Sequence, residues 1–553
     1  MSELSDRGNN QAKDARHKYK QGMLEKEGQP LTSRRRGKAE EARIKRKGEI
    51  LNKRRKIHPY AAGQSVDPVQ LQEALEGLRK GGSGLLEHVR KLREMLSLEL
   101  PPIQDVIDGG GVEPLLRLLG NADDDLKLEA TWCLTNMASG DTSQTRHVVE
   151  GAPAFITFLA CGNPLLQEQA AWALGNIAGD SPECRALLTA NGAILPLTRL
   201  LSSQSPDLAR TAAWALSNLA RGENTSADPF AAAGTLPLLV QLLQNEACDS
   251  KLRVELAWLA AFLTAREDHN VTSLVKEGLA QPLVRSLVLA IRGEEGGELL
   301  ATPVLRSLGN LCAGLPTWLE AAMEVPQFLP VLAAALGADA TKQRALVRWT
   351  CLGASELRLS IITLIPTSPD QVKEAAWTVS NVCAGSAAYR TALLQQGVLS
   401  RLAQLLKSDQ FDLQREAVHA VWNLVAEGAN LQEVIDMEGV LEAIVKLLKV
   451  PDTSVVVVVL SMLDRVCATV PGGPLCVEQA HGLEAIDDLH YSQVNEQLCA
   501  QAAKIVDTYY GEDYIGEGEH VGAMSGMAER SPPHTIGRGK AMTEPAWMHH
   551  QQH

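Results

Sequence analysis

Trp172-Ala-Leu-Gly-Asn176 and Trp214-Ala-Leu-Ser-Asn218 are two copies of the pattern that decides the fold of this chain. In each copy an asparagine follows a tryptophan by four residues, and a glycine that opens a Leu-rich segment comes later. The other clear copies begin at Trp132 and Trp377, and weaker copies begin at Trp258, Arg306 and His419. Successive copies are 40, 42, 44, 48, 71 and 42 residues apart. The chain therefore contains an internal repeat.

A period near 42 residues is typical of armadillo repeats, whose three-helix units pack only against their neighbours. Glycine tolerates the sharp turn between the first and second helices of a unit. The glycines that follow the copies are Gly151, Gly192, Gly234, Gly278, Gly397 and Gly439. Hydrophobic residues make up 45% of the chain and aromatic residues 4%, which favours stacked helices over a β-sandwich. We predict an all-α, right-handed superhelical armadillo solenoid.

We expect the repeat array to span residues 70–511. Pro101-Pro-Ile-Gln opens its first unit, and a helix pair within 482–510 closes it. The 71-residue spacing exceeds the period by about 29 residues, which indicates an insertion near 338–370. An added loop or helix and a gene-model error both explain this excess. Residues 1–30 and 512–553 are predicted to be disordered.

Several classes of protein are disfavoured. The ten cysteines include no Cys-x-x-Cys pair, which indicates reduced thiols in a cytosolic or nuclear protein. The N-terminus has no apolar signal core, and the apolar run at 455–460 is too short to span a membrane. We find no phosphate loop, zinc-spaced Cys/His set or nucleophile elbow. We therefore expect no enzymatic activity, no cofactor and no metal.

The Trp and Asn of each copy lie on one face of a helix, because residues i and i+4 are neighbours there. An Asn amide can donate to the carbonyls and accept from the N–H groups of an extended peptide. An indole accommodates the stem of Lys or Arg and attracts its charge. The alternative is that the indoles are core and the asparagines are caps, but a buried interior rarely places unpartnered Asn at one register repeatedly. The pattern favours a groove for a basic peptide.

This pattern resembles the importin-α family of nuclear import adaptors from about Ser33 to Glu512. The resemblance implies that basic nuclear localisation signals bind in the concave groove, with Gly140 and Thr145 around the most deeply bound lysine. The implied major-site residues are Trp132, Asn136, Gly140, Thr145, Trp172, Asn176, Asp180, Trp214, Asn218, Arg221, Glu255 and Trp258. The implied minor-site residues are Arg306, Asn310, Glu374, Trp377, Asn381, Glu416, His419 and Asn423.

Three positions depart from the family pattern. His419 stands where the minor site usually has Trp, Phe262 where an aromatic hydroxyl is usual, and Leu319 where a Thr would contact a minor-site lysine. We therefore expect an intact major site and a weak or altered minor site. Shortening a bipartite signal to its major cluster should then reduce the affinity by less than about tenfold.

Charge is divided between a basic arm and an acidic body. Residues 1–56 contain 18 Lys/Arg and 8 Asp/Glu, and the remainder carries a net charge of −23 within a total of −13. Residues 31–57 resemble an importin-β-binding segment, whose last cluster, Lys53-Arg54-Arg55-Lys56, imitates a localisation signal and occupies the groove when importin-β is absent. The implied contact residues are Arg34, Arg35, Arg36, Arg43, Lys45, Arg46, Lys47, Lys53, Arg54 and Arg55. A nucleic-acid-binding tail is the alternative, but no stacking aromatics are interleaved.

The resemblance implies further partners. They are importin-β, cargo proteins with basic signals, and the dedicated importin-α exportin with the Ran GTPase, the exportin contact lying near residues 484–510. It also implies shuttling between cytoplasm and nucleus, without direct nucleic-acid binding or membrane insertion. The rivals are a non-transport armadillo scaffold and a relative that no longer transports. A β-catenin-like groove is basic, whereas this array is acidic, and such scaffolds lack the arm.

Overall fold

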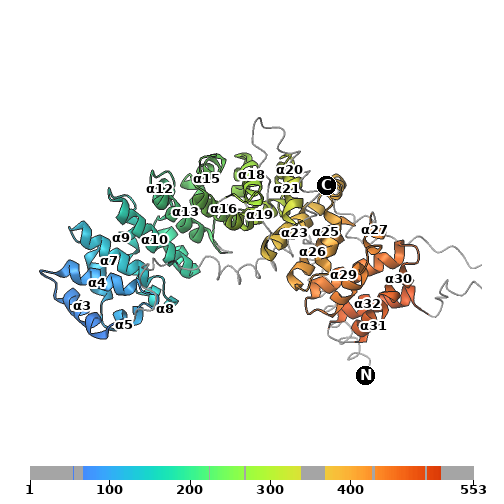
Figure 1. Ribbon diagram of the computed structural model, residues 1–553, viewed down its shortest axis with the longest axis horizontal. Helices are drawn as coiled ribbons and strands as arrows, with labels where there is room; N and C mark the ends of the chain where they lie inside the picture. The colour runs from blue at the N-terminus through green and yellow to red at the C-terminus, as the bar shows by residue number, and fades with distance from the viewer. Residues whose placement is uncertain are drawn as a thin grey trace, which may run out of the picture.

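The computed structural model describes Arg54 and residues 66–222, 225–266, 269–294, 296–337, 368–425, 430–491 and 495–511. All regular elements of these residues are helices. They stack into one arched array that runs from α3 to α32 (Figure 1). Within the described ranges, no helix has the length and apolarity that a membrane span requires. The predicted all-α solenoid is confirmed.

The array begins with a helix pair that precedes the opening unit predicted at Pro101. α3 (Pro68–Lys80) packs against α4 (Leu85–Leu96) and against α6 (Val112–Leu118). α4 packs against α7 (Asp124–Met137). This pair covers the first apolar face of the stack, as the end of a solenoid requires. It carries no Trp–Asn pair, so the repeat pattern gave no sign of it.

Units of three helices follow. The first unit consists of α5 (Ile103–Asp108), α6 and α7. The second consists of α8 (Thr142–Arg146), η1 (Val149–Gly151), α9 (Ala152–Phe158) and α10 (Pro164–Asp180). The third consists of α11 (Pro182–Ala190), α12 (Ile194–Leu200) and α13 (Pro206–Ala220), and the fourth of α14 (Asp228–Ala232), α15 (Thr235–Gln244) and α16 (Ser250–Leu263). The middle units are α17 (His269–Lys276), α18 (Ala280–Ile291) and α19 (Gly297–Ala313), then α20 (Pro316–Met323), α21 (Phe328–Ala335) and α23 (Pro369–Cys383), then α24 (Ala387–Gln395), α25 (Val398–Leu406) and α26 (Phe411–Leu424). The last two units are α27 (Leu431–Ile435), α28 (Val440–Lys446), η2 (Leu447–Lys449) and α29 (Thr453–Thr469), then α30 (Gly473–Gln479), α31 (Gly482–Tyr491) and α32 (Glu496–Tyr509). α31 and α32 correspond to the predicted closing pair.

The third helix of each unit forms the inner layer of the arch. In Figure 1, α10, α13, α16, α19, α23 and α26 lie along the inner side, and α12, α15 and α18 lie outside them. These inner helices pack against one another in series. Every residue of α16 from Leu252 to Leu263 is buried, as expected of a helix that is covered on all sides. The Trp–Asn pattern lies on this inner layer.

Side-chain caps fix where the inner helices begin. Asn163 accepts hydrogen bonds from the N–H groups of Leu165 and Leu166, and Ser205 accepts one from Leu208. Ser368 and Gln371 form a reciprocal capping box at the start of α23. Such caps satisfy N–H groups that have no partner within the helix, and Pro at the first helical position of all three helices suits the same site.

Five of the six repeat glycines adopt the left-handed backbone that was predicted from the turn. Their φ angles are +78° at Gly192, +74° at Gly234, +87° at Gly278, +72° at Gly397 and +71° at Gly439.

Gly151 differs, because its φ is −75° within a helical turn. A Cβ there would lie 2.8 Å from the Phe155 ring, so this glycine provides space for a buried ring and not a turn.

The stack continues across the 71-residue spacing. α23 packs directly against α19 and α21. The Thr378 hydroxyl donates to the carbonyl of Leu305 (3.2 Å), and Asn381 Nδ2 donates to the carbonyl of Gly309 (3.0 Å). Most of the predicted insertion, residues 338–367, lies outside the described residues and joins the second and third helices of this unit.

The described cysteines are all unpaired thiols, as expected. Cys133, Cys312 and Cys383 are buried, and burial raises the pKa of the Cys383 thiol to about 12. These thiols are therefore neutral packing groups.

Candidate functional site

The asparagines of the repeat connect neighbouring units. Except at Asn136, Nδ2 donates to a backbone carbonyl in the last turns of the preceding inner helix. The bonds are Asn176 to Thr135 (3.0 Å), Asn218 to Gly175 (3.0 Å), Asn310 to Ala261 (3.1 Å), Asn381 to Gly309 (3.0 Å) and Asn423 to Ser380 (2.8 Å). Asn136 donates instead to the hydroxyl of Ser97 (3.0 Å), at the end of α4. Half of the alternative considered from the sequence is therefore correct, because the asparagines do cap backbone groups.

The Asn176 carboxamide also binds the basic arm. Asn176 Oδ1 accepts the backbone N–H of Arg54 (2.8 Å), and Asn176 Nδ2 donates to the Arg54 carbonyl (2.9 Å). Trp172 Nε1 donates to the same carbonyl (2.7 Å). The Oδ1 atoms of Asn136 and Asn218 are buried and have no hydrogen-bond partner among the described residues. Buried acceptors of this kind are normally satisfied, so two further positions in this row can each receive an N–H group.

The side chain of Arg54 lies in the slot formed by the indoles. Its guanidinium carbon is 4.8 Å from the centre of the Trp214 ring, within the range of a cation–π contact. Its Nη2 donates to Glu255 Oε1 (2.8 Å). One residue of the basic arm is thus held by main-chain, aromatic and acidic contacts together. The remaining nine predicted contact residues of the arm lie outside the described residues.

Three of the indoles are buried, and Trp214 and Trp258 belong to the hydrophobic core as well as contacting cations. Trp214, Trp258 and Trp377 are 1%, 6% and 6% exposed, whereas Trp132 and Trp172 are half-buried. Arg54 lies over Trp214, and the Arg306 guanidinium lies 5.3 Å from the centre of the Trp258 ring. Trp258 also stacks on Phe262. Cations cover these two rings, as expected of indoles that face a groove.

Glu255 is an acidic group placed in apolar surroundings. Its side chain is 8% exposed and stands on α16 three residues before Trp258. Burial raises the pKa of its carboxyl, and the charge and hydrogen bond of Arg54 partly oppose that rise. Because an isolated buried carboxylate is costly, Glu255 favours a cation beside it.

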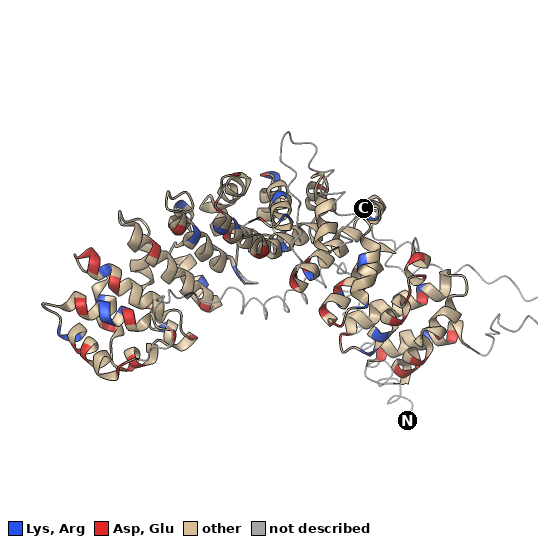
Figure 2. Cartoon of the chain, viewed as in Figure 1, with Lys and Arg blue, Asp and Glu red and all other residues tan. Residues whose placement is uncertain are grey.

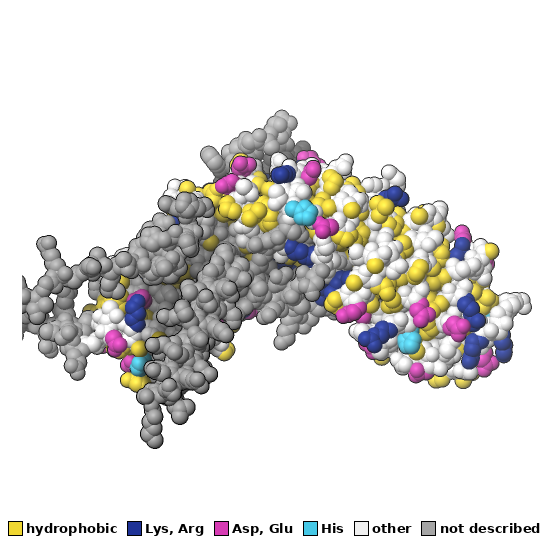
Figure 3. All heavy atoms as spheres, turned by 180° about the vertical axis from the view of Figure 1, so that it is seen from behind, with side chains coloured by type: hydrophobic (Ala, Val, Ile, Leu, Met, Phe, Trp, Pro, Cys, Tyr) yellow, Lys and Arg dark blue, Asp and Glu magenta, His cyan; other side chains and the backbone are white. Residues whose placement is uncertain are grey.

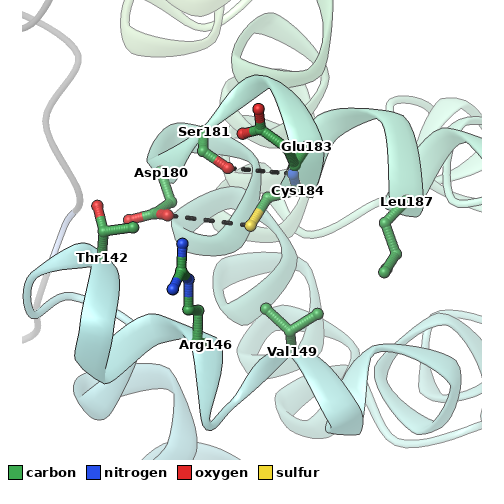
Figure 4. Close-up of a pocket in the computed structure, with 8 residues that line it drawn as sticks. All are labelled: Thr142, Arg146, Val149, Asp180, Ser181, Glu183, Cys184 and Leu187. Atoms are coloured by element: carbon green, nitrogen blue, oxygen red, sulfur yellow. Dashed lines mark hydrogen bonds between the residues drawn. The ribbon is translucent and has the colours of Figure 1, made fainter.

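Asp180, the last residue of α10, lies at the edge of a pocket of about 250 Å³ (Figure 4). Thr142 and Arg146 come from α8 of the same unit, and Cys184 comes from α11 of the next unit. The Cys184 thiol lies 3.9 Å from Asp180 Oδ2. Across α8, the Thr145 hydroxyl donates to the carbonyl of Asp141 (2.8 Å). Asp180 thus lies beside residues of α8 and α11, and its role as a rim carboxylate stays a prediction.

Gly140 gives the backbone beside this rim an approach that a side chain would block. A Cβ at Gly140 would lie 2.1 Å from Gln144 Oε1, in the first turn of α8. The structure thus places Gly140 after the end of α7, Thr145 on α8 and Asp180 at the end of α10.

Two contacts at the first indole were not predicted. The Arg93 guanidinium lies 4.8 Å from the centre of the Trp132 ring, and its Nε donates to Glu129 Oε2 (2.8 Å). Arg90 reaches the same carboxylate (3.3 Å). Arg93 belongs to α4, which carries no Trp–Asn pair. The repeat pattern therefore could not reveal this contact.

At the predicted minor site an internal ion pair fills the position of one indole. Nη2 and Nε of Arg306 donate to Glu374 Oε1 at 2.6 and 3.2 Å, and both residues are buried. Arg306 lies on α19 and Glu374 on α23, so the pair joins two units. One oxygen of a carboxylate that we expected to bind peptide cations is therefore taken by Arg306.

The far end of the minor site is rearranged. His419 is buried, and Glu416 pairs with its neighbour Arg415 (3.2 Å). Trp422 stands three residues after His419 on α26, and the Arg465 guanidinium of α29 lies 4.4 Å from its ring centre. The indole absent at 419 thus has a counterpart one turn later, covered by a resident cation. Leu319 is buried and offers no hydroxyl.

Glycines seat two of the indoles. A Cβ on Gly175 would lie 2.3 Å from Cζ3 of Trp214, and one on Gly309 would lie 1.9 Å from Cζ3 of Trp377. A side chain at either position would displace the ring of the next unit.

Gly175→Ala should therefore destabilise the protein by about 1–3 kcal/mol, although alanine alone favours a helix over glycine. It should also weaken binding of a basic peptide, because Trp214 moves. Thermal unfolding and a fluorescence titration measure the two effects. Gly162→Ala is the matched control, since nothing lies within 4 Å of its added Cβ. Equal behaviour of the two variants would contradict the seating of Trp214.

Charge is spread along the whole array. Asp and Glu occur from the first units to the last, with Lys and Arg between them (Figure 2). From behind, both signs are interspersed over the end formed by the first units (Figure 3). Cations are therefore bound by individual carboxylates at particular positions, such as Glu255.

Comparisons with known proteins agree with this geometry. The family model described as "Armadillo/beta-catenin-like repeat" matches residues 101–139, 143–179, 181–221 and 386–426. Importin subunit alpha-9 of Arabidopsis thaliana is 30% identical over 84% of this chain and 87% of its own length. Importin subunit alpha-2 and alpha-1a of Oryza sativa subsp. japonica are 31% and 29% identical, over 80% and 95% of this chain and 82% and 96% of their own lengths. The crystal structure of an engineered protein covers 79% of this chain and 98% of its own at a TM-score of 0.65 and 24% identity, which supports the fold alone.

Proposed function

The chain belongs to the importin-α family, and from that premise we propose that it is a nuclear import adaptor that binds basic localisation signals on its inner helices and links them to importin-β. One observation carries the proposal: Asn176 and Trp172 hold both backbone polar groups of Arg54 while Glu255 and Trp214 receive its side chain. These contacts suit any extended peptide with Arg or Lys at that position. The groove is thus selective for charge and for extended backbone.

The same contacts give the arm an inhibitory role in this proposal. Arg54 belongs to the chain itself, so the cluster at 53–56 competes with cargo from within the molecule. Importin-β would remove the competitor by binding residues 31–57, which makes cargo loading conditional. Release by the exportin with Ran, and shuttling between cytoplasm and nucleus, complete the proposed cycle. The minor site remains proposed as weak, because Glu374 and Trp422 already have cationic partners.

Fluorescence titration of a labelled Lys-rich signal peptide tests the groove. The chain lacking residues 1–57 should bind this peptide, and Asp180→Lys should weaken binding about 100-fold, because a repulsive charge replaces the rim carboxylate. Lys251→Ala, an exposed change at the outer start of α16, should have no effect. Equal binding by Asp180→Lys would favour a scaffold that does not read basic signals.

Lower pH should weaken the hold on the arm. Protonation of Glu255 removes the charge that Arg54 pairs with, and burial makes this carboxyl protonate above the ordinary range. Proton binding and arm binding therefore compete, and the arm is favoured as the pH rises. A synthetic peptide of residues 50–57 should lose up to about tenfold in affinity from about pH 7 to about pH 5. Glu255→Gln should bind it weakly at both values, and an unchanged pH dependence in that variant would assign the effect to another group.

A further inference from the structure

One position at the rim of the groove has the opposite charge to its neighbours. Asp180 follows Asn176 by four residues at the end of α10, and Arg221 follows Asn218 by three residues at the end of α13. The ends of successive inner helices thus present a carboxylate and then, one register position earlier, a guanidinium. A groove that only selected cations would have no use for the second group.

Among the described residues, the guanidinium of Arg221 has no partner for its charge. No described residue forms a hydrogen bond or ion pair with its guanidinium, although its backbone carbonyl accepts from Thr225 (3.0 Å). The side chain is half-buried, and burial lowers the pKa of the guanidinium. A cation removed from water without a counter-charge is unfavourable, so the site is improved by any anion that reaches it.

A second guanidinium strengthens the positive field there. Arg185 is 8% exposed, donates from Nη1 to the carbonyl of Ala178 (3.0 Å), and has a buried Nε without a partner in the described structure. A Cβ on Gly222 would lie 3.2 Å from its Nη2, which places Arg185 against the residue after Arg221. Burial and then the charge of Arg221 lower the pKa of Arg185, while Asp180 and Glu183 oppose this only in part.

A third arginine closes the turn. Arg266 Nη2 donates to the carbonyl of Gly222 and lies 3.4 Å from that of Ala220. These carbonyls orient the Arg266 guanidinium at the turn. Three arginines thus meet at the described part of the turn after α13, and Arg221 alone of them lies in the row of predicted groove residues.

We propose that Arg221, supported by Arg185, is an anion subsite that reads a carboxylate or phosphate on the bound peptide next to its basic cluster. The inference rests on the proposed function, since the ligand is the cargo peptide. Guanidinium groups bind both anions through paired N–H groups, so Glu, Asp and phosphoserine share this chemistry. Arg54 makes no contact with Arg221, so a cargo with an anion here gains a contact that Arg54 does not supply. The subsite would help such a cargo to displace the arm.

The test uses the full chain and fluorescein-labelled Lys-rich peptides. The parent peptide carries Gln at four positions on each side of the basic cluster, and each panel member replaces one Gln with Glu. At one position Glu should tighten binding about three- to tenfold. In Arg221→Ala and Arg221→Gln the ratio of the affinities for the Glu and Gln peptides should fall to about one, whatever happens to the affinity for the parent peptide. Arg199→Ala, an exposed arginine on the outer helix α12, should keep the gain.

The possible results distinguish the anion subsite from the proposed function on which it rests. If the parent peptide did not bind, or bound Asp180→Lys as tightly as the unchanged chain, the proposed function itself would be overturned. Binding of the parent without any Glu position that depends on Arg221 would overturn the subsite alone, as would a gain that persists in both Arg221 variants. Phosphoserine at the responsive position then identifies the source. A gain with phosphoserine only assigns the subsite to phosphorylated cargo, and a gain with both assigns it to anions in general.

Discussion

Deleting residues 1–57 should tighten the binding of a basic signal peptide about a thousandfold in the absence of importin-β. A tethered competitor at roughly millimolar effective concentration, with micromolar affinity, lowers the apparent affinity for cargo by ~4 kcal/mol. The competitor's contacts are visible at Arg54, which takes the Asn176 carboxamide, the Trp172 N–H and the Glu255 carboxylate. Cargo cannot use these groups until the arm leaves.

Fluorescence anisotropy of a labelled signal peptide against both chains measures this effect. Adding the deleted segment back as a free peptide should restore only weak competition, because the gain from tethering is lost. Arg54→Ala in the full chain should recover part of the thousandfold, since one residue of the cluster is removed. If the two chains bound the peptide with equal affinity, Arg54 would be a passive occupant and autoinhibition would be wrong.

The fold could be predicted almost completely from the sequence. A 42-residue period, the Trp–Asn register and the glycines predicted stacked three-helix units, and the N-caps at Asn163, Ser205 and Ser368 agree with them. The first helix pair lies inside the predicted array of residues 70–511, but its helices could not be placed because the end of a solenoid does not carry the repeated groove residues. Gly151 escaped because space for Phe155 and a left-handed turn both require glycine, and the sequence does not separate these reasons.

The sequence predicted which residues form the candidate site but not which atoms each of them contacts. The Trp and Asn positions followed from helical spacing, yet the sequence could not show that the Asn Nδ2 atoms bind the preceding unit while the Asn176 Oδ1 accepts from Arg54. Contacts such as Arg93 over Trp132 and Arg465 over Trp422 join residues of different units. Their geometry depends on the rotation between units, which no local pattern encodes. The same holds for Arg306 and Glu374, 68 residues apart in the chain.

Arg306→Ala should destabilise the centre of the array by about 3–5 kcal/mol. The change leaves the Glu374 carboxylate buried without its partner, and an uncompensated buried charge is far more costly than the loss of an exposed ion pair. It also removes the cation that lies over Trp258. Arg415→Ala is the matched control, because its pairs with Asp412 and Glu416 are more exposed and should contribute less than about 1 kcal/mol.

Urea unfolding gives the overall loss, and hydrogen exchange in α19 and α23 locates it, since a solenoid can unfold in parts. The double change Arg306→Met with Glu374→Leu separates the two causes that a single change mixes. If the penalty comes from the stranded carboxylate, the apolar pair should recover most of the lost stability, as buried ion pairs often contribute little over a packed apolar pair. If the double variant were as unstable as Arg306→Ala, the packing of the arginine stem between α16 and α23 would be the main contribution. In either case the ion pair takes the place of an indole slot, which is why we expect the second basic cluster of a bipartite signal to add little here.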